Sequence, residues 1–135
     1  MGLNKKQVEF TSDMAYFQVW CIENGHQIIE GESHRPKVLA ALYALPKNSK
    51  VRKKIYDLLG VHLDSNRKKG IKYSTHVSKL GRDFFIYKNG TVSWGAEDYR
   101  PLGEKWKSMR PGNCWGGDFK SRDAVHFSKE HNGVQ

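Results

Sequence analysis

The sequence contains no long uninterrupted run of apolar residues. The longest stretch, residues 38–45, falls far short of the roughly 20 residues that span a bilayer. The N-terminus, residues 1–6, is basic, but Glu9 and Asp13 interrupt the apolar segment that a signal peptide would need next. We therefore expect neither a membrane span nor a signal peptide, and synthesis in the cytoplasm.

Cysteine is also scarce. Cys21 and Cys114 lie far apart and lack the close spacing of a zinc knuckle or a redox pair. We interpret both as buried thiols, with a disulfide between them left open if the protein works outside the cytoplasm. Heptads, internal repeats and the aromatic motif of RNA-binding sheets are absent too, which argues against a dedicated nucleic-acid partner.

Positive charge, by contrast, is abundant. The 135 residues carry 23 Lys and Arg against 14 Asp and Glu, a net charge of +9, with basic runs at 50–54 and 67–69. Such a balance favours an anionic partner, and nucleic acid, lipid headgroups and bacterial wall polymer all qualify. The 12% aromatic content argues against disorder, and the length predicts a single domain over 1–135. We expect this domain to be a monomer.

The hydrophobic pattern predicts helices first and antiparallel strands later. We expect helices over 5–24, 36–45, 49–59 and 101–110, a loop over 64–73, and strands over 26–32, 83–87, 91–94, 114–119 and 124–128. The Asn89-Gly90 pair supplies the positive φ angles of a tight hairpin turn between two of these strands. This order predicts an α+β fold, a small antiparallel sheet with flanking helices.

The first helix has the clearest period. Phe10, Met14, Phe17 and Cys21 recur at three- and four-residue steps, and we expect Ala15, Val19 and Ile22 to widen this buried stripe. Gly25 follows where a C-terminal cap is expected. Trp94, Trp106 and Trp115 are expected in the core, as large aromatic residues usually are.

Histidines and carboxylates flank the predicted strands in a way that suggests a zinc site. A catalytic zinc takes three protein ligands, with nitrogen and oxygen donors at about 2.0–2.2 Å, and keeps one position open. His76, Asp83 and His126 supply such a set. Because seven residues separate the first two, they would face opposite ways in a regular strand, so the segment 79–81 must break the pleat. Asp123 lies three residues before His126, which suits a carboxylate on a turn and an imidazole on a strand, so Asp123 would face the zinc-bound water instead of the metal.

These residues fall in an ordered motif. Ser74-x-His76 is followed in register by Asp83, and Trp115-Gly-Gly-Asp-Phe119 is followed by Asp123-x-x-His126. This arrangement resembles the LAS zinc peptidases of bacterial cell-wall metabolism, which include D-alanyl-D-alanine carboxypeptidases and the L-alanyl-D-glutamate endopeptidases of phage endolysins. Lys79 stands where that family has Gly, and Gly81 where it has Ala.

The resemblance implies a Hedgehog/DD-peptidase-like domain that binds one Zn²⁺ through His76, Asp83 and His126. It implies that Asp123 is the general base, and that Arg35 holds a substrate carboxylate or the developing oxyanion, with His34 as the alternative. The implied partners are the peptidoglycan stem peptide and the anionic surface of the wall.

Several functions stay open at this point. The resemblance favours an L-alanyl-D-glutamate endopeptidase acting as a phage or prophage endolysin, released to the wall through a phage-made membrane lesion, in a holin-dependent way. The alternatives are a D-Ala-D-Ala carboxypeptidase of the same family, a basic nucleic-acid-binding module or nuclease, and an inactive relative kept as a binding domain.

Overall fold

The computed structural model describes residues 2–35, 37–46, 48–58 and 74–135. The fold is α+β, an open antiparallel sheet with flanking helices, as the order of the predicted elements indicated. The helices are α1 (Leu3–Glu23), α2 (Lys37–Tyr43), α3 (Lys50–Leu58) and α4 (Ala96–Met109), and the strands are β1 (Ile28–Glu30), β2 (Gly81–Lys88), β3 (Thr91–Val92), β4 (Asn113–Trp115) and β5 (His126–Lys129). The loop expected over 64–73 lies outside the described residues.

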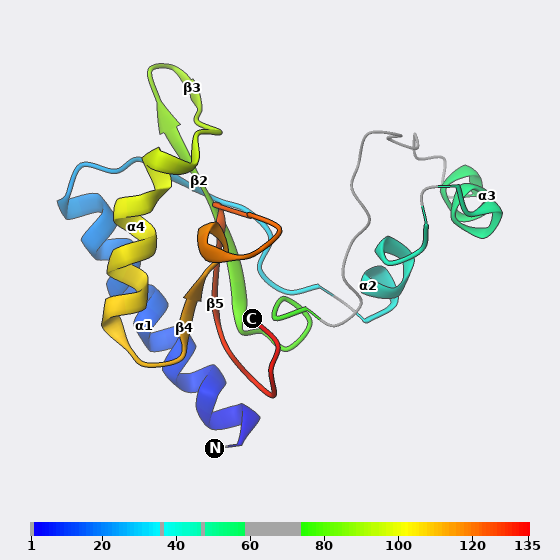
Figure 1. The fold of residues 1–135 in the computed structure, drawn as a ribbon, viewed down its shortest axis with the longest axis horizontal. Coiled ribbons are helices and arrows are strands. Elements are labelled where there is room, and N and C mark those ends of the chain that lie inside the picture. Colours follow the sequence, from blue (N-terminus) through cyan, green and yellow to red (C-terminus); the bar gives the residue numbers. More distant parts are fainter. Residues whose placement is uncertain (1, 36, 47, 59–73) are drawn as a thin grey trace.

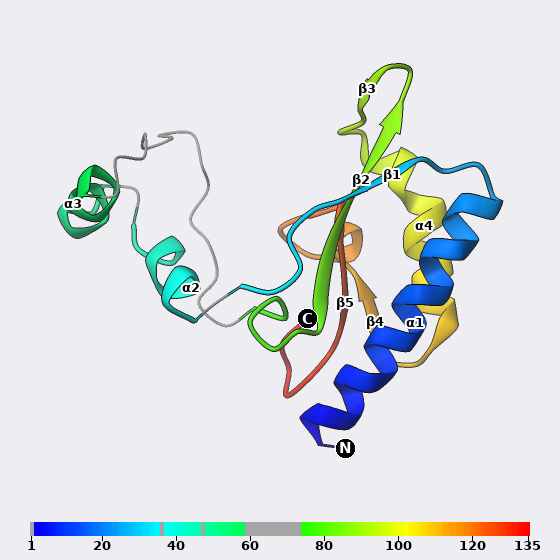
Figure 2. The same ribbon diagram turned by 180° about the vertical axis from the view of Figure 1, so that it is seen from behind.

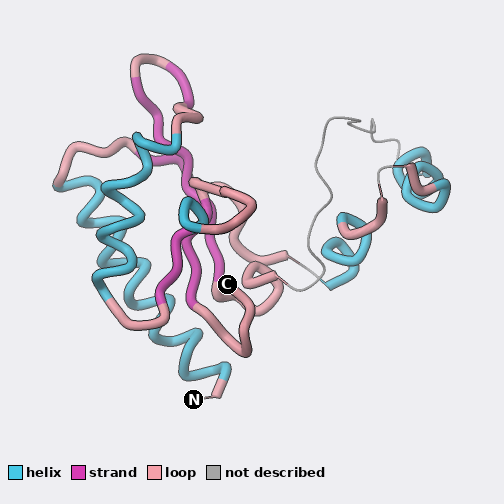
Figure 3. Tube along the Cα trace, in the orientation of Figure 1, coloured by secondary structure: helices cyan, strands magenta, loops and turns pink. Residues whose placement is uncertain are grey.

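The sheet runs in the order β1-β2-β5-β4, and β3 pairs with the far end of β2 (Figure 3). All pairs are antiparallel, and Asp83 on β2 lies directly opposite His126 on β5. The predicted hairpin is confirmed: Asn89 and Gly90 have φ angles of 54° and 78° and join β2 to β3. The long strand β2 therefore contacts three other strands and organises the sheet.

Helices α1 and α4 pack side by side against one face of the sheet (Figures 1 and 2). Phe17 of α1 is fully buried there, with its ring centroid 5.1 Å from that of Phe127, 5.5 Å from that of Trp106 and 6.1 Å from that of Phe84. This aromatic core joins both helices to the two central strands. Burial of several such side chains at about 1.5–3 kcal/mol each makes it the main source of stability.

The stripe on α1 is narrower than the sequence suggested. Phe10, Met14, Phe17 and Cys21 are buried as expected, whereas Ala15, Val19 and Ile22 are exposed, because only one side of α1 meets the sheet and α4. Asp13 is buried instead, where it accepts two hydrogen bonds from Arg110 at 2.6 and 2.9 Å. Gly25 follows α1 with a φ of 78°, as expected of a cap.

Three further expectations need correction. Helix α4 begins at Ala96 rather than Pro101, because Glu97 and Asp98 favour its first turn and the proline is accommodated inside. The strand expected over 114–119 ends at Trp115, where residues 116–118 turn into a 3₁₀ helix. Trp106 and Trp115 are buried as predicted, but Trp94 is exposed and packs only its edge on Phe85.

Both cysteines are free thiols. Cys21 is buried, which raises its pKa to about 12, and Cys114 is partly buried. Among the described residues, no helix combines the length and the apolar character needed to cross a membrane.

Candidate metal centre

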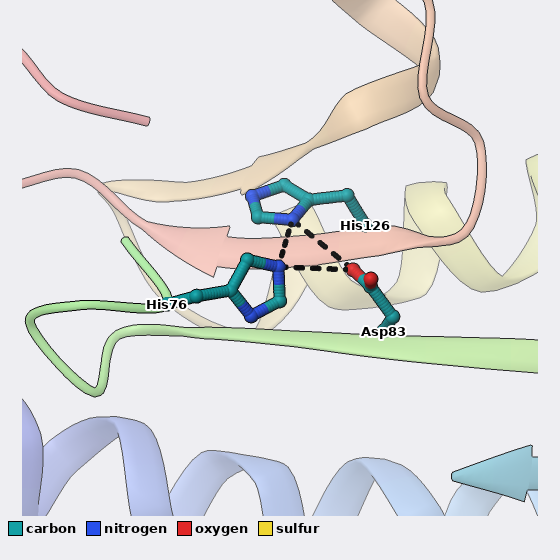
Figure 4. Close-up of side chains that lie close together, drawn as sticks. All are labelled: His76, Asp83 and His126. Carbon is teal, nitrogen blue, oxygen red and sulfur yellow. Dashed lines mark hydrogen bonds and ion pairs between the residues drawn. The ribbon is translucent and has the colours of Figure 1, made fainter. Parts of the chain in front are cut away.

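His76, Asp83 and His126 come together on the sheet face opposite α1 and α4 (Figure 4). Asp83 is the third residue of β2, and His126 is the first residue of β5. The two are cross-strand partners, so their side chains point to the same face of the sheet. His76 is contributed by a turn, residues 75–79, which leads into β2.

This turn explains how His76 and Asp83, which are seven residues apart, reach the same side of the sheet. Lys79 adopts a left-handed conformation with a φ of 60°, and its amide and that of Leu80 bond back to the carbonyls of His76 and Thr75. The chain therefore reverses before β2 begins, and His76 folds back over the strand. The expected break in the pleat is present, and it is a turn that ends at Lys79.

The three donor atoms form a compact triangle. His76 Nε2 lies 3.2 Å from Asp83 Oδ1, His126 Nδ1 lies 3.3 Å from the same oxygen, and the two nitrogens lie 3.2 Å apart. In a tetrahedral zinc site with ligand bonds of about 2.0–2.1 Å, neighbouring donors lie about 3.3–3.4 Å apart. The triangle thus has the dimensions of one face of that tetrahedron.

Each imidazole is held from behind by an oxygen atom. The Nδ1 atom of His76 lies 2.8 Å from the carbonyl oxygen of Ser33, and Nε2 of His126 lies 3.2 Å from Oγ1 of Thr75. A carbonyl only accepts, so Nδ1 of His76 carries the proton, and its Nε2 presents a lone pair to the cluster when the ring is neutral. Such outer contacts are typical of histidines that bind metals.

The pKa shifts of His76 and Asp83 indicate that the cluster stabilises a positive charge next to the carboxylate. Burial is the largest influence on the pKa of His76 and lowers it, but the hydrogen bond and charge of Asp83 and the Ser33 carbonyl together raise the pKa above its usual value. For Asp83, burial raises the pKa, and the two histidines outweigh burial and lower it. Two neutral imidazoles and a carboxylate fit Zn²⁺ as ligands, because the ion supplies the charge that the cluster favours.

Arg35 lies beside this cluster. Its backbone N–H donates to the carbonyl of His76 at 3.0 Å, and its Nε donates to the carboxylate of Glu32. The segment leading to it extends the pairing of β1 with β2, since the amide of Asp83 donates to the carbonyl of Glu32 at 2.8 Å. His34 in the same segment is exposed. The structure therefore places the backbone of Arg35 next to His76, and its role toward a substrate stays a prediction.

Asp123 lies in the turn that precedes β5. Its carbonyl accepts a hydrogen bond from the amide of His126 at 3.0 Å, and its own amide donates to the carbonyl of Gly116 at 2.9 Å. A side chain at Gly116 would lie 2.0 Å from the Asp123 carbonyl, so the turn requires glycine there. The carboxylate thus lies on a turn and the imidazole on a strand, as expected. Asp118, the aspartate of the Trp115-Gly-Gly-Asp-Phe119 motif, is exposed and ion-paired to Lys107 at 2.7 Å.

Three contributors escaped prediction from the sequence. Ser33 and Thr75 hold the histidines, and Glu32 holds Arg35. Ser33 acts through its backbone carbonyl, which no side-chain pattern reveals. For Thr75 the sequence contains one indication, which is Gly81 at the position where the motif of the LAS peptidases has Ala.

No protein-family model matches the sequence, and no curated protein sequence matches it. Among solved structures, the chain is similar to the Serratia marcescens L-Ala D-Glu endopeptidase ChiX, with 17% sequence identity and a TM-score of 0.45. The match covers 78% of this chain and 68% of that one.

Proposed function

We propose that the protein is a zinc-dependent peptidoglycan peptidase, a single domain that cleaves the L-alanyl-D-glutamate bond of the stem peptide as a phage or prophage endolysin. The observation that carries the proposal is the donor triangle of His76, Asp83 and His126, with both imidazoles held from behind. The motif around these residues supports the choice of reaction and substrate. The net charge of +9 supports an anionic wall as the surface approached.

In this proposal the three ligands would hold Zn²⁺, which when bound would supply a Lewis acid for the scissile carbonyl and the attacking water. Asp123 takes the proton of the attacking water and passes it to the leaving amine. Its place three residues before His126, whose amide donates to the Asp123 carbonyl, supports that role. Arg35 binds a substrate carboxylate or the developing oxyanion, and its backbone hydrogen bond to His76 keeps it near the reaction.

Metal content is the first test of this proposal. We expect one zinc per chain in the wild type, and none in His76→Ala or His126→Ala, by elemental mass spectrometry of the purified protein. Arg35→Lys is the matched control, which should keep the zinc and lose activity because the planar fork of donors is gone. Full zinc occupancy in His126→Ala, or wild-type activity in Arg35→Lys, contradicts the assigned roles.

The bond is identified by mass spectrometry of purified wall after digestion. Fragments with a new N-terminal D-glutamate indicate the endopeptidase, whereas free D-alanine indicates the carboxypeptidase. The wild type incubated with RNA and DNA under the same conditions should leave both intact. Cleavage of nucleic acid with no wall fragments would overturn the proposal in favour of a nuclease.

A further inference from the structure

We propose that Thr75 is a positioning residue for His126, and that Gly81 is the glycine that makes room for it. This inference rests on the proposed function, because it concerns how His126 is prepared to bind the metal. Thr75 immediately precedes the ligand His76, but its side chain acts on the other ligand histidine, across the sheet.

The contact is buried on both sides. Oγ1 of Thr75 lies 3.2 Å from Nε2 of His126, and the two residues are 0% and 5% exposed. Water therefore does not compete for this hydrogen bond, and a buried polar atom deprived of its partner is costly. The Nδ1 atom of the same ring lies on the side of His76 and Asp83.

The main chain of Thr75 is fixed as well. Its carbonyl accepts hydrogen bonds from the amide of Leu80 at 2.8 Å and from the hydroxyl of Ser78 at 3.1 Å. These bonds close the turn before β2 and hold the residue against the start of that strand. The hydroxyl is thus presented to His126 by a rigid segment.

Gly81 supplies the space for this hydroxyl. A Cβ atom at position 81 would lie 2.4 Å from Oγ1 of Thr75, closer than any real contact, and 3.1 Å from Cε1 of His126. The backbone of Gly81 does not have a positive φ, so conformation does not explain the glycine. The sequence has Gly81 where the motif of the LAS peptidases has Ala, and the Thr75 hydroxyl occupies the volume of the missing methyl group. The two residues therefore act as a pair.

The chemical consequence concerns the orientation of the His126 ring. A hydroxyl both donates and accepts, so in the metal-free site it can donate to Nε2 while Nδ1–H faces the Asp83 carboxylate, and with a metal on Nδ1 it accepts from Nε2–H. A ring held in this orientation in both states binds a metal without first having to turn. Thr75 acts on the metal only through His126.

The first experiment compares Thr75→Val, which keeps the shape of the side chain and removes the hydrogen bond, with Thr75→Ser, which keeps the hydroxyl. Zinc affinity, measured by competition with a chelator, should fall about 10- to 100-fold in Thr75→Val, as for outer contacts of metal-binding histidines. Thr75→Ser should recover most of the loss. Wild-type affinity in Thr75→Val would overturn the proposal.

The second readout is the ring proton of His126. Long-range ¹H–¹⁵N spectra of the zinc-loaded protein should show Nε2–H of His126 in slow exchange with water in the wild type and in Thr75→Ser. In Thr75→Val this proton should exchange faster, because it has lost its acceptor. Equal exchange rates in the wild type and in Thr75→Val would overturn the proposal even if zinc binds.

A double-mutant cycle in the metal-free protein tests the role of Gly81. Gly81→Ala should lower the melting temperature, because the added methyl group meets the Thr75 hydroxyl. In Thr75→Ala/Gly81→Ala most of the loss should be regained, since the obstructing oxygen is gone. An equal loss in both backgrounds would refute the pairing. If the wild type binds no zinc, the proposed function fails, whereas the cycle in the metal-free protein still decides whether Thr75 and Gly81 act as a pair.

Discussion

The two faces of the sheet differ in kind, although neighbouring residues of one strand build them. On β5, Phe127 points into the aromatic core under α1 and α4, whereas His126 points to the opposite face and the cluster with His76 and Asp83. On β2, Phe84 and Asp83 divide in the same way. The first face is apolar and closed by helices, and the second gathers two imidazoles and a carboxylate.

This difference indicates that the aromatic face provides most of the stability and that the opposite face provides the candidate chemistry. A variant on the core face should reduce the free energy of unfolding and spare the metal centre, whereas a ligand variant on the other face should lose the metal and change the stability of the metal-free protein little. The strands are shared, so the separation holds only as long as the sheet keeps its register. The predictions below test this division, from the largest expected effect to the smallest.

The largest effect is expected from Asp123→Asn, which removes the proposed base from the metal-centre face. Hydrolysis of wall peptide should fall by about 10²- to 10⁴-fold, the usual contribution of a positioned acid-base group. The variant should keep its zinc and its fold, because Asp123 is not one of the three ligands. Activity within about tenfold of the wild type, less than that contribution, means that Asp123 is not the base.

Phe17→Ala addresses the opposite face. Phe17 contacts Phe84, Trp106 and Phe127, and removal of so large a buried ring should cost about 3–5 kcal/mol of unfolding free energy, measured by chemical denaturation. The folded protein at low temperature should still bind one zinc per chain. A folded variant that has lost its zinc would show that the two faces are not separable.

Removal of the metal connects the two faces through mass action. A ligand that binds only the folded state adds about 2.7 kcal/mol of stability at 100 times its dissociation constant and about 4.1 kcal/mol at 1,000 times. EDTA should therefore lower the melting temperature of the zinc-loaded protein. His126→Ala is the control, and its melting temperature should not respond to EDTA. An equal response in both proteins would mean that the ion binds elsewhere.

The smallest effect is expected at Lys79, whose left-handed φ of 60° is strained for a residue with a side chain. Lys79→Gly should stabilise the protein by about 1 kcal/mol, because glycine adopts this conformation without strain. Lys79→Ala removes the charge and keeps the strain, so it should give no such gain. A gain of equal size in both variants would assign the effect to the charge.

The sequence predicted the elements best where one local rule decides them. The period of Phe10, Met14, Phe17 and Cys21 fixes the buried side of α1, and Asn89-Gly90 fixes the hairpin. Prediction was poorer where burial depends on distant neighbours. Val19, Ile22 and Trp94 are exposed because no element of the described chain covers them, and no local pattern contains that information.

The ligand set could be proposed from the sequence because donor chemistry and order along the chain point to the same three residues. Their convergence could not be derived, since it depends on the pairing of β2 with β5 and on the turn that returns His76 to the strand. The hydrogen bonds that hold the two histidines were even harder to predict from the sequence. The hydrogen bond of Thr75 to His126 joins residues 51 positions apart in the chain.

In the proposed zinc site, the direct pairing of Asp83 with His126 also sets the earliest time at which an ion can have all three ligands. Synthesis proceeds from the N-terminus, and His126 follows Asp83 by 43 residues, so a ribosome working at about 5–20 residues per second needs about 2–9 seconds to make the intervening segment. During that interval the nascent chain has two donors of the three. Binding by all three ligands would therefore wait until β5 joins the sheet, and a bound ion would show that the sheet is complete.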